Sequence, residues 1–452
     1  MLLSLNLKHT KDCFKLALPV MLTQLGQVSV NLFDNMMVGN ILGADALAST
    51  ALANAVFFSL YIFAVGFSFA IPPLVSEAQA QDNHQKINSV FRHGLVVNLA
   101  IGIVLSLILL GIAPLMHYAK QPPQIIPNAI LYLNIITLSI IPVMIFQTLR
   151  EVSEGLSYTI GVTIATIMAN VINIALNYIF MVGLFGIEPM GISGAAYATL
   201  ISRVFSMLFL YLVMAHHKTT KRYIQEFSLK IQLFERKMFQ NLVKLGLPTA
   251  LQLFFEVTAF ALASFICGLV SATDIAAHQV TISMASFTFN LCAGFGVAST
   301  IMIGKKRGEK DFVAAKEIGI NNLKIAFLFM SLCCLGFILG KDFLPTLFTK
   351  PNELAVAHLA SQLLVIASLF QLSDGLQVVA LGCLRGIQDV KIPSIITFIA
   401  YWGITLPLGY FLCVEQKMGA YGMWIGFGLG LTFSAIFLVR RFILISKRQV
   451  KS

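Results

Sequence analysis

The feature that most constrains this chain is a series of long apolar runs. A helix rises about 1.5 Å per residue, so a run of roughly 20 residues can cross a hydrocarbon core of about 30 Å. Hydrophobic residues make up 58% of the chain and charged residues only 11%, a composition far from that of soluble domains. The runs predict twelve membrane-spanning helices, at 14–38, 46–76, 94–115, 126–149, 158–183, 190–214, 241–269, 276–303, 321–345, 355–382, 392–413 and 419–443.

Two halves of the chain repeat one another. The segment KLALP at 15–19 matches KLGLP at 244–248, and the same offset of 229 residues aligns Gly39 with Gly268. Each half holds an even number of runs, so both halves enter the membrane from the same side. We therefore expect an all-α membrane protein with two six-helix lobes related by a pseudo-two-fold axis normal to the membrane, an architecture typical of transporters. The expected divisions are an N-terminal lobe at 1–214, a cytoplasmic linker at 215–240 and a C-terminal lobe at 241–452.

Basic residues predict the orientation. Of the 31 Lys and Arg, 26 fall in the two termini and the even-numbered links or in the span ends beside them, and four fall in or beside the links on the other side. Because cytoplasmic segments carry an excess of Lys and Arg, we expect both termini on the cytoplasmic side of the cell inner membrane. The net charge of +11 lies mostly in these segments, so it indicates contact with membrane lipid rather than nucleic acid. Arg203 is left inside the sixth predicted helix, and the sequence does not identify its partner.

Sequence motifs for other kinds of chemistry are missing. There is no GxxxxGK[ST] motif, which ATP-driven pumps use to hold phosphates. No nucleophile elbow or paired acid/base motif indicates an enzyme. The seven Cys and eight His show no metal-ligand spacing, so we expect no cofactor. We also expect the protein to act as a monomer.

Three acidic residues lie deep inside predicted spans: Asp34, Glu256 and Asp374. Each would cost about 2.5–3.5 kcal/mol at the centre of a membrane helix, so each needs a cavity or a partner. One alternative is that they form buried ion pairs or lie beyond the true ends of the helices. Basic residues at that depth are nearly absent, which favours a functional role in binding cations.

Polar side chains continue from these acids along the same helix faces. In the first predicted helix Gln27, Asn31 and Asp34 are spaced by four and three residues, which places them on one face. Similar stripes occur in the fifth, seventh and tenth helices. We interpret the following residues as ligands of a cation or a substrate: Gln27, Asn31, Asn173, Asn177, Gln252 and Gln371. Thr163 and Gln377 are interpreted instead as contacts between helices.

Five segments in chain order carry a family resemblance: LALPVMLTQLGQVSVNLFDNMMVG, NVINIALNYIF, FFEVTAFA, AAHQV and LSDGLQVVALGCLRG. Together they resemble the multidrug and toxic compound extrusion (MATE) family, and specifically its NorM branch. The resemblance implies that the three intramembrane acids take part in cation coupling and substrate transport, and that Asn173 and Asn177 lie near the first of them. One position departs from some members, because Phe370 stands where they have a tyrosine and so removes a hydroxyl ligand.

The acids suggest a mechanism. A carboxylate removed from water can hold a proton, a Na⁺ ion or an organic cation, each to the exclusion of the others, and antiport requires such competition. We predict an exporter of organic, mostly cationic and aromatic drugs in exchange for Na⁺, held by Glu256 and Asp374, with H⁺ as the alternative ion. Phe255 and Phe287 would offer cation–π surfaces. The alternative is a flippase for lipid or lipid-linked sugar, which would need Arg and Lys in its cavity, where only Arg203 is available.

Overall fold

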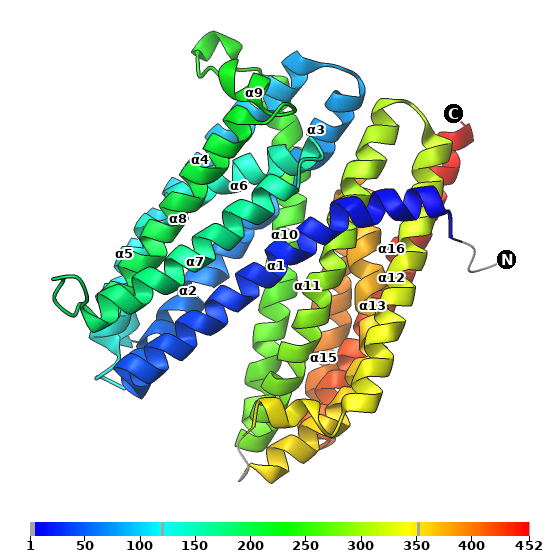
Figure 1. Cartoon of the computed structure of the whole chain (residues 1–452). Coiled ribbons are helices and arrows are strands. Elements are labelled where there is room, and N and C mark those ends of the chain that lie inside the picture. The colour runs from blue at the N-terminus through cyan, green and yellow to red at the C-terminus, as the bar shows by residue number, and fades with distance from the viewer. Residues whose placement is uncertain (1–4, 119–121, 350–352, 452) are drawn as a thin grey trace. The chain divides into compact units, whose positions relative to one another are not determined.

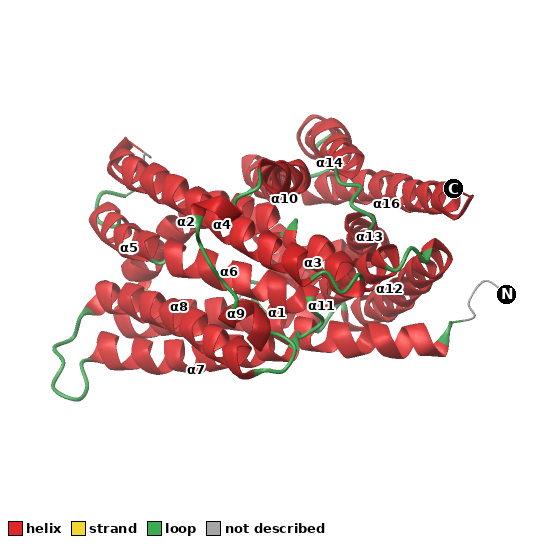
Figure 2. Ribbon diagram, turned by 90° about the horizontal axis from the view of Figure 1, so that it is seen from above, coloured by secondary structure: helices red, strands yellow, loops and turns green. Residues whose placement is uncertain are grey.

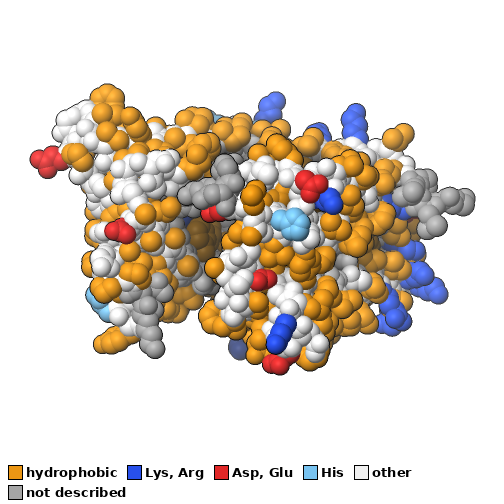
Figure 3. Space-filling model, turned by 90° about the horizontal axis from the view of Figure 1, so that it is seen from below, with side chains coloured by type: hydrophobic (Ala, Val, Ile, Leu, Met, Phe, Trp, Pro, Cys, Tyr) orange, Lys and Arg blue, Asp and Glu red, His pale blue; other side chains and the backbone are white. Residues whose placement is uncertain are grey.

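The computed structural model describes residues 5–118, 122–349 and 353–451. Every regular element in these residues is helical, which confirms the all-α prediction (Figures 1 and 2). Within the same residues, eleven helices are long and apolar enough to cross a membrane. Two more helices, α5 (Ile126–Leu138) and α6 (Ile140–Gly155), are long and apolar enough only together, and they meet at an angle of 43°, so the number is twelve if this pair is one span. On the face seen in Figure 3, hydrophobic side chains predominate, and most of the Lys and Arg side chains lie along its edges.

The chain folds as two compact units. The N-terminal unit is Leu22–Ala250, and the C-terminal unit comprises the described residues of Met1–Met21 and Leu251–Ser452. The chain passes from one unit to the other inside two helices, α1 (Leu7–Leu42) and α10 (Arg236–Val270), rather than in loops. The lobes expected at 1–214 and 241–452 were defined by the sequence repeat, and these boundaries stay a prediction.

The two crossing helices correspond in the repeat. Both contain a proline shortly before the crossing, Pro19 in α1 and Pro248 in α10. The first residues after the crossings, Leu22 and Leu251, are related by the same offset of 229 residues that relates the sequence repeats. Each helix therefore contributes its start to one unit and its remainder to the other.

Contacts within the units hold these helix starts. In the C-terminal unit, the Phe14 ring lies 5.3 Å from that of Phe295 and the backbone N–H of Asn6 donates to Asn321 Oδ1 at 2.8 Å. In the N-terminal unit, the start of α10 packs closely against the second span, because a Cβ at Gly246 would lie 2.9 Å from the Phe67 ring.

The N-terminal unit consists of helices whose apolar faces enclose a main core, around buried residues such as Phe57, Leu133 and Met144. Besides the part of α1 from Leu22 and the start of α10, it contains α2 (Ala44–Ser68), α3 (Ile71–Ala80), α4 (His84–Ile112), η1 (Ala113–Tyr118), α5, α6, α7 (Ile160–Val182), α8 (Gly191–His216), α9 (Lys221–Gln225) and η2 (Ile231–Leu233).

Two more acids are buried than the sequence indicated. Glu151 and Glu154 were placed in the link after the fourth predicted span, but α6 continues to Gly155 and both are only 1% exposed. Arg150 Nε donates to Glu154 Oε1 at 2.8 Å, and Gln147 Nε2 donates to Glu151 Oε1 at 2.7 Å. The predicted span therefore ended too early, because protein partners replace water for these two acids and α6 continues through them.

The partner of Arg203 is a hydroxyl and an aromatic ring. Arg203 Nη1 donates to Ser139 Oγ at 2.6 Å, at the break between α5 and α6. Its guanidinium carbon also lies 4.8 Å from the centroid of the Phe57 ring, within the range of a cation–π contact. The two contacts tie α8 to α5 and α2 inside the N-terminal unit.

The C-terminal unit is built around two long helices in close contact, α11 (Ala272–Gly308) and α13 (Leu354–Gly386). A Cβ at Gly382 would overlap the backbone of Gly296, so this approach requires glycine. Apart from α11, α13, the part of α10 from Leu251 and the start of α1, the unit contains α12 (Phe312–Gly340), η3 (Leu344–Leu347), α14 (Lys391–Phe398), η4 (Ile399–Thr405), α15 (Leu406–Tyr410), η5 (Phe411–Glu415) and α16 (Ala420–Lys451).

The span predicted at 392–413 changes its helical geometry along its length. The segments η4 and η5 are π-helical and enclose the short α-helix α15. A π-turn holds more residues than an α-turn, so it rotates the side chains that follow it relative to an α-helical register. Tyr401 lies in the first of these segments, and its side chain is fully buried.

Candidate functional site

Glu256 stands at the meeting point of three helical segments in the C-terminal unit. Its side chain is 6% exposed in the middle of α10. The Tyr401 hydroxyl, from η4, donates to Glu256 Oε1 at 3.0 Å. Gln377 Nε2, from α13, donates to the Tyr401 hydroxyl at 2.9 Å and lies 3.5 Å from the same carboxylate oxygen. One oxygen of Glu256 thus accepts from two donors. The sequence analysis interpreted Gln377 as a contact between helices, and the structure shows that it contacts Tyr401 and Glu256.

Asp374 lies on α13 and is 4% exposed. It is close enough to Glu256 for their charges to interact, and that interaction is repulsive when both carboxylates are ionised. Two acids in one buried region favour a bound positive charge, because little water reaches them and the charge of Arg385 acts on Glu256 alone. The sequence analysis assigned these two acids to one cation, and that assignment stays a prediction.

Several amide atoms beside these acids lack a hydrogen-bond partner. Gln371 and Gln377 lie one helical turn before and after Asp374 on α13, on the same side of that helix. Both are buried, and the carbonyl oxygens Gln371 Oε1 and Gln377 Oε1 have no hydrogen-bond partner. Gln252 Nε2, one turn before Glu256, is likewise buried and unpaired. Buried polar atoms are nearly always paired, so these atoms indicate a place for a ligand.

The donor set suits a hard cation. Carboxylate, hydroxyl and amide oxygens are the ligands that hard ions prefer, and this region offers all three kinds. Within the described residues, no three His, Cys, Asp or Glu side chains gather into a metal site. An ion here would therefore be held by Glu256 and Asp374 together with neutral oxygens.

Phe370 does not contribute to this polar region. Its ring packs edge-on against Trp424, at 5.4 Å between centroids, and against Phe427, at 6.1 Å. The tyrosine expected there in some family members is thus replaced by a residue of the aromatic core. The hydroxyl beside the acids comes instead from Tyr401, on a different helix.

The two predicted aromatic ligands have different surroundings. Phe255 is half-buried, with its ring 4.8 Å from Phe398 and 6.2 Å from Trp402, and its carbonyl accepts a hydrogen bond from Trp402 Nε1 at 3.1 Å. Phe287, on α11, is 49% exposed. Phe255 therefore belongs to an aromatic group beside the acid-bearing turn of α10, and the binding roles of both residues stay predictions.

Asp34 forms a separate site within the N-terminal unit. Asn177 Nδ2 donates to Asp34 Oδ1 at 2.5 Å and also contacts Asn173 Oδ1 at 3.1 Å. Asn173 Nδ2 in turn lies 3.4 Å from Ser202 Oγ, so the network joins α1, α7 and α8. The structure brings Asp34 together with the two asparagines named from the sequence.

The other polar residues of α1 are less enclosed. Gln27 is half-buried and Asn31 is exposed. Asn177 Oδ1, by contrast, is buried without a hydrogen-bond partner. The buried amide oxygen left without a partner beside Asp34 therefore belongs to α7 rather than to α1.

Sequence reasoning missed Tyr401. The residue is separated from Glu256 by 145 positions and lies in an apolar run with no acid of its own. Its hydroxyl was the available signal, because a buried tyrosine usually finds a hydrogen-bond partner. Nothing in the spacing of the run points to Glu256 as that partner.

Comparison with known proteins agrees with the repeat and the fold. The model of the MatE family matches residues 19–179 and 248–411, two segments that begin at equivalent positions of the repeat. The "Probable multidrug resistance protein NorM" of Agrobacterium fabrum is 31% identical over 98% of this chain and 96% of its own length. The "Multidrug resistance protein MdtK" of Yersinia pseudotuberculosis is 31% identical over 96% of this chain and 95% of its own.

Solved structures show the same fold. One is described as the outward-facing conformation of a multidrug resistance MATE family transporter of the MOP superfamily. It superimposes with a TM-score of 0.88 at 20% identity, covering 100% of this chain and 98% of its own. With the family match extending over both halves, the chain belongs to the MATE family of transporters and is of the NorM type.

Proposed function

We propose that this protein exports organic, mostly cationic and aromatic compounds from the cell in exchange for Na⁺. Multidrug resistance is the property named for its relatives. The observation that carries the coupling proposal is the buried pair Glu256 and Asp374, with the Tyr401 hydroxyl and the unpaired oxygens of Gln371 and Gln377 beside it.

The coupling follows from charge. Two buried carboxylates hold one positive charge far better than none, because the ion relieves their repulsion and replaces lost water. A drug cation and Na⁺ therefore compete for the same negative charge. Entry of Na⁺ from outside displaces the drug, and release of Na⁺ inside frees the acids for the next drug. The same competition at Asp34 would link the N-terminal unit to the cycle.

Na⁺ is favoured over H⁺ by the neutral oxygens. A proton needs only one carboxylate, whereas Na⁺ needs several oxygen ligands at once. Tyr401 and the glutamines supply such oxygens around Glu256 and Asp374. A lipid or lipid-linked sugar flippase is less well supported, because the guanidinium of Arg203 is engaged with Ser139 and Phe57.

Purified protein in liposomes tests the choice of ion. With the same pH on both sides of the membrane, an inward Na⁺ gradient is expected to drive efflux of a cationic dye. Tyr401→Phe is expected to raise the Na⁺ concentration that gives half-maximal efflux several-fold, because it removes one oxygen and leaves the ring in place. Phe411→Leu, at an exposed position of the same span, serves as the control. Full efflux driven by a pH gradient in Na⁺-free buffer, with no response to Na⁺, would show H⁺ coupling instead.

We also propose that the protein spans the inner membrane with both termini and the 215–240 link on its cytoplasmic side. In Figure 1 the two described ends of the chain lie at the same end of the C-terminal unit as the turn joining α11 and α12. That end of α11 carries Lys305, Lys306 and Arg307 in its last turn. The positive-inside rule assigns this end to the cytoplasm.

Cysteine labelling of intact cells checks this orientation. A membrane-impermeant maleimide is expected to label Phe185→Cys, in the exposed loop between α7 and α8, and to spare Lys218→Cys in the link, in a background without the native cysteines. Permeabilising the cells should make Lys218→Cys reactive. The reverse pattern would contradict the proposed topology.

A further inference from the structure

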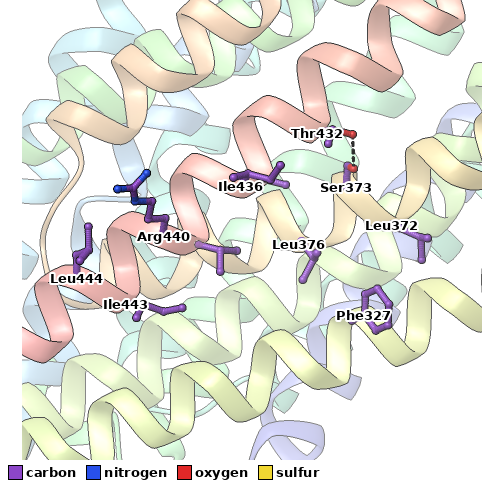
Figure 4. A pocket seen from close by; sticks show the side chains of 11 residues that line it. Phe327, Leu372, Ser373, Leu376, Thr432, Ile436, Arg440, Ile443 and Leu444 are labelled. Atoms are coloured by element: carbon purple, nitrogen blue, oxygen red, sulfur yellow. Dashed lines mark hydrogen bonds between the residues drawn. The ribbon is translucent and has the colours of Figure 1, made fainter. Parts of the chain in front are cut away.

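A groove on the C-terminal unit lies apart from the acids. It has a volume of about 570 Å³ and is lined by residues of α12, α13 and α16 (Figure 4). Eight of its eleven lining residues are apolar, among them Phe327, Leu376 and Ile436, and Arg440 is the one charged residue in the lining. Such a groove in a membrane protein fits an extended apolar ligand better than a polar one.

The two hydroxyls in the groove satisfy each other. Ser373 Oγ and Thr432 Oγ1 lie 2.9 Å apart, as the dashed line in Figure 4 shows. Thr432 Oγ1 also donates to the carbonyl of Gly428 at 2.7 Å. A ligand therefore meets little unsatisfied polarity at this end of the groove.

Arg440 differs from the arginine that follows it. Arg441 forms two hydrogen bonds with the carboxylate of Asp389, at 2.5 and 3.0 Å. Arg440 is exposed, and within the described residues it has no ion pair. In Figure 4 its guanidinium is directed toward the Leu444 end of the groove rather than the Thr432 end. The groove thus offers one uncompensated positive charge near one end of an apolar channel.

The dimensions match one lipid chain. From Thr432 to Leu444, α16 rises about 18 Å at 1.5 Å per residue, close to the depth of a single leaflet of about 15 Å. The helix continues past the groove to Arg448 and Lys451, which lie in its basic last turn. Under the orientation proposed above, that end faces the cytoplasmic leaflet, where anionic lipids are concentrated.

We propose that this groove binds one anionic phospholipid of the cytoplasmic leaflet. Its acyl chain lies along the apolar walls formed by α12, α13 and α16, and its phosphate pairs with Arg440. The site lies in the C-terminal unit alone and does not depend on which ion drives transport.

Native mass spectrometry of the delipidated protein tests the site. With matched acyl chains, the protein is expected to bind a first phosphatidylglycerol about fivefold more tightly than a first phosphatidylcholine, the ratio that one basic residue supplies. Arg440→Gln is expected to remove this preference. Arg448→Gln, which removes an exposed arginine of the same helix outside the groove, is expected to retain it.

A second pair of variants tests the apolar walls. Ile436→Trp fills the groove and is expected to weaken first binding of both lipids, whereas Phe437→Trp, at the neighbouring exposed position outside the lining, is not. Unchanged melting temperatures confirm that all four variants are folded.

Four results would overturn the proposal. One is equal affinity of the unaltered protein for the two lipids, and another is an equal effect of Arg440→Gln and Arg448→Gln. The third is a stable dimer whose formation Ile436→Trp prevents, because the groove would then be an interface between copies of the chain. Binding of inorganic phosphate that Ile436→Trp leaves unchanged, with no lipid bound, would also contradict an acyl-chain site.

Discussion

Glu256→Gln and Asp374→Asn are each expected to reduce drug export to the level of cells without the transporter. Each substitution keeps the shape of the side chain and removes its charge, so the pair can no longer exchange a drug cation for a coupling ion. In Glu256→Gln the Tyr401 hydroxyl can still donate to the amide oxygen of the new side chain, so the local packing is kept. Drug resistance of cells and dye efflux from proteoliposomes measure the loss.

Stability separates this explanation from simple misfolding. A charged acid at the centre of a membrane helix costs about 2.5–3.5 kcal/mol, so neutralising it should leave the melting temperature unchanged or raised. Glu188→Gln, at an exposed loop position, is the matched control and should export normally. Normal export by either Glu256→Gln or Asp374→Asn would refute the assignment of the coupling acids.

Asp34→Asn is expected to slow drug efflux roughly tenfold, equivalent to about 1.4 kcal/mol in the transport barrier. The effect is smaller because Asp34 lies outside the pair Glu256 and Asp374, which can still exchange a drug cation for the coupling ion, and because Asn177 still holds α1 to α7. The initial rate of efflux under a fixed Na⁺ gradient measures it. Asp45→Asn, at an exposed position in the first turn of α2, serves as the control, and equal rates in the two variants would remove Asp34 from the mechanism.

The positions of the spans could be predicted because apolar length is a local property of the chain. Helix ends were less predictable, since α6 runs on through Glu151 and Glu154, whose carboxylates find partners in the protein instead of water. A sequence shows that a residue is polar, but not that a folded neighbour will satisfy it. The predicted link after 149 therefore became part of a buried helix.

The candidate sites were predictable to different degrees for the same reason. Asn173 and Asn177 follow helical spacing, so a single stripe placed both on one face of α7. Tyr401 could not be assigned in this way, because its partner is 145 residues away and a π-helical segment alters the angular register of its helix. Periodicity identifies a polar face, whereas the partner of that face is decided by the packing of distant helices.

The crossings inside α1 and α10 also bear on how chimeric transporters should be joined. A recombination joint in the 215–240 link would carry the start of α10 away from the N-terminal unit that it packs into, and would leave the start of α1 attached to a foreign partner. Joints between Met21 and Leu22 and between Ala250 and Leu251 would transplant each unit whole. One module that can be exchanged is therefore the continuous segment Leu22–Ala250. The other is formed by the two segments that flank it in the sequence, and neither module is simply the first or the second half of the chain.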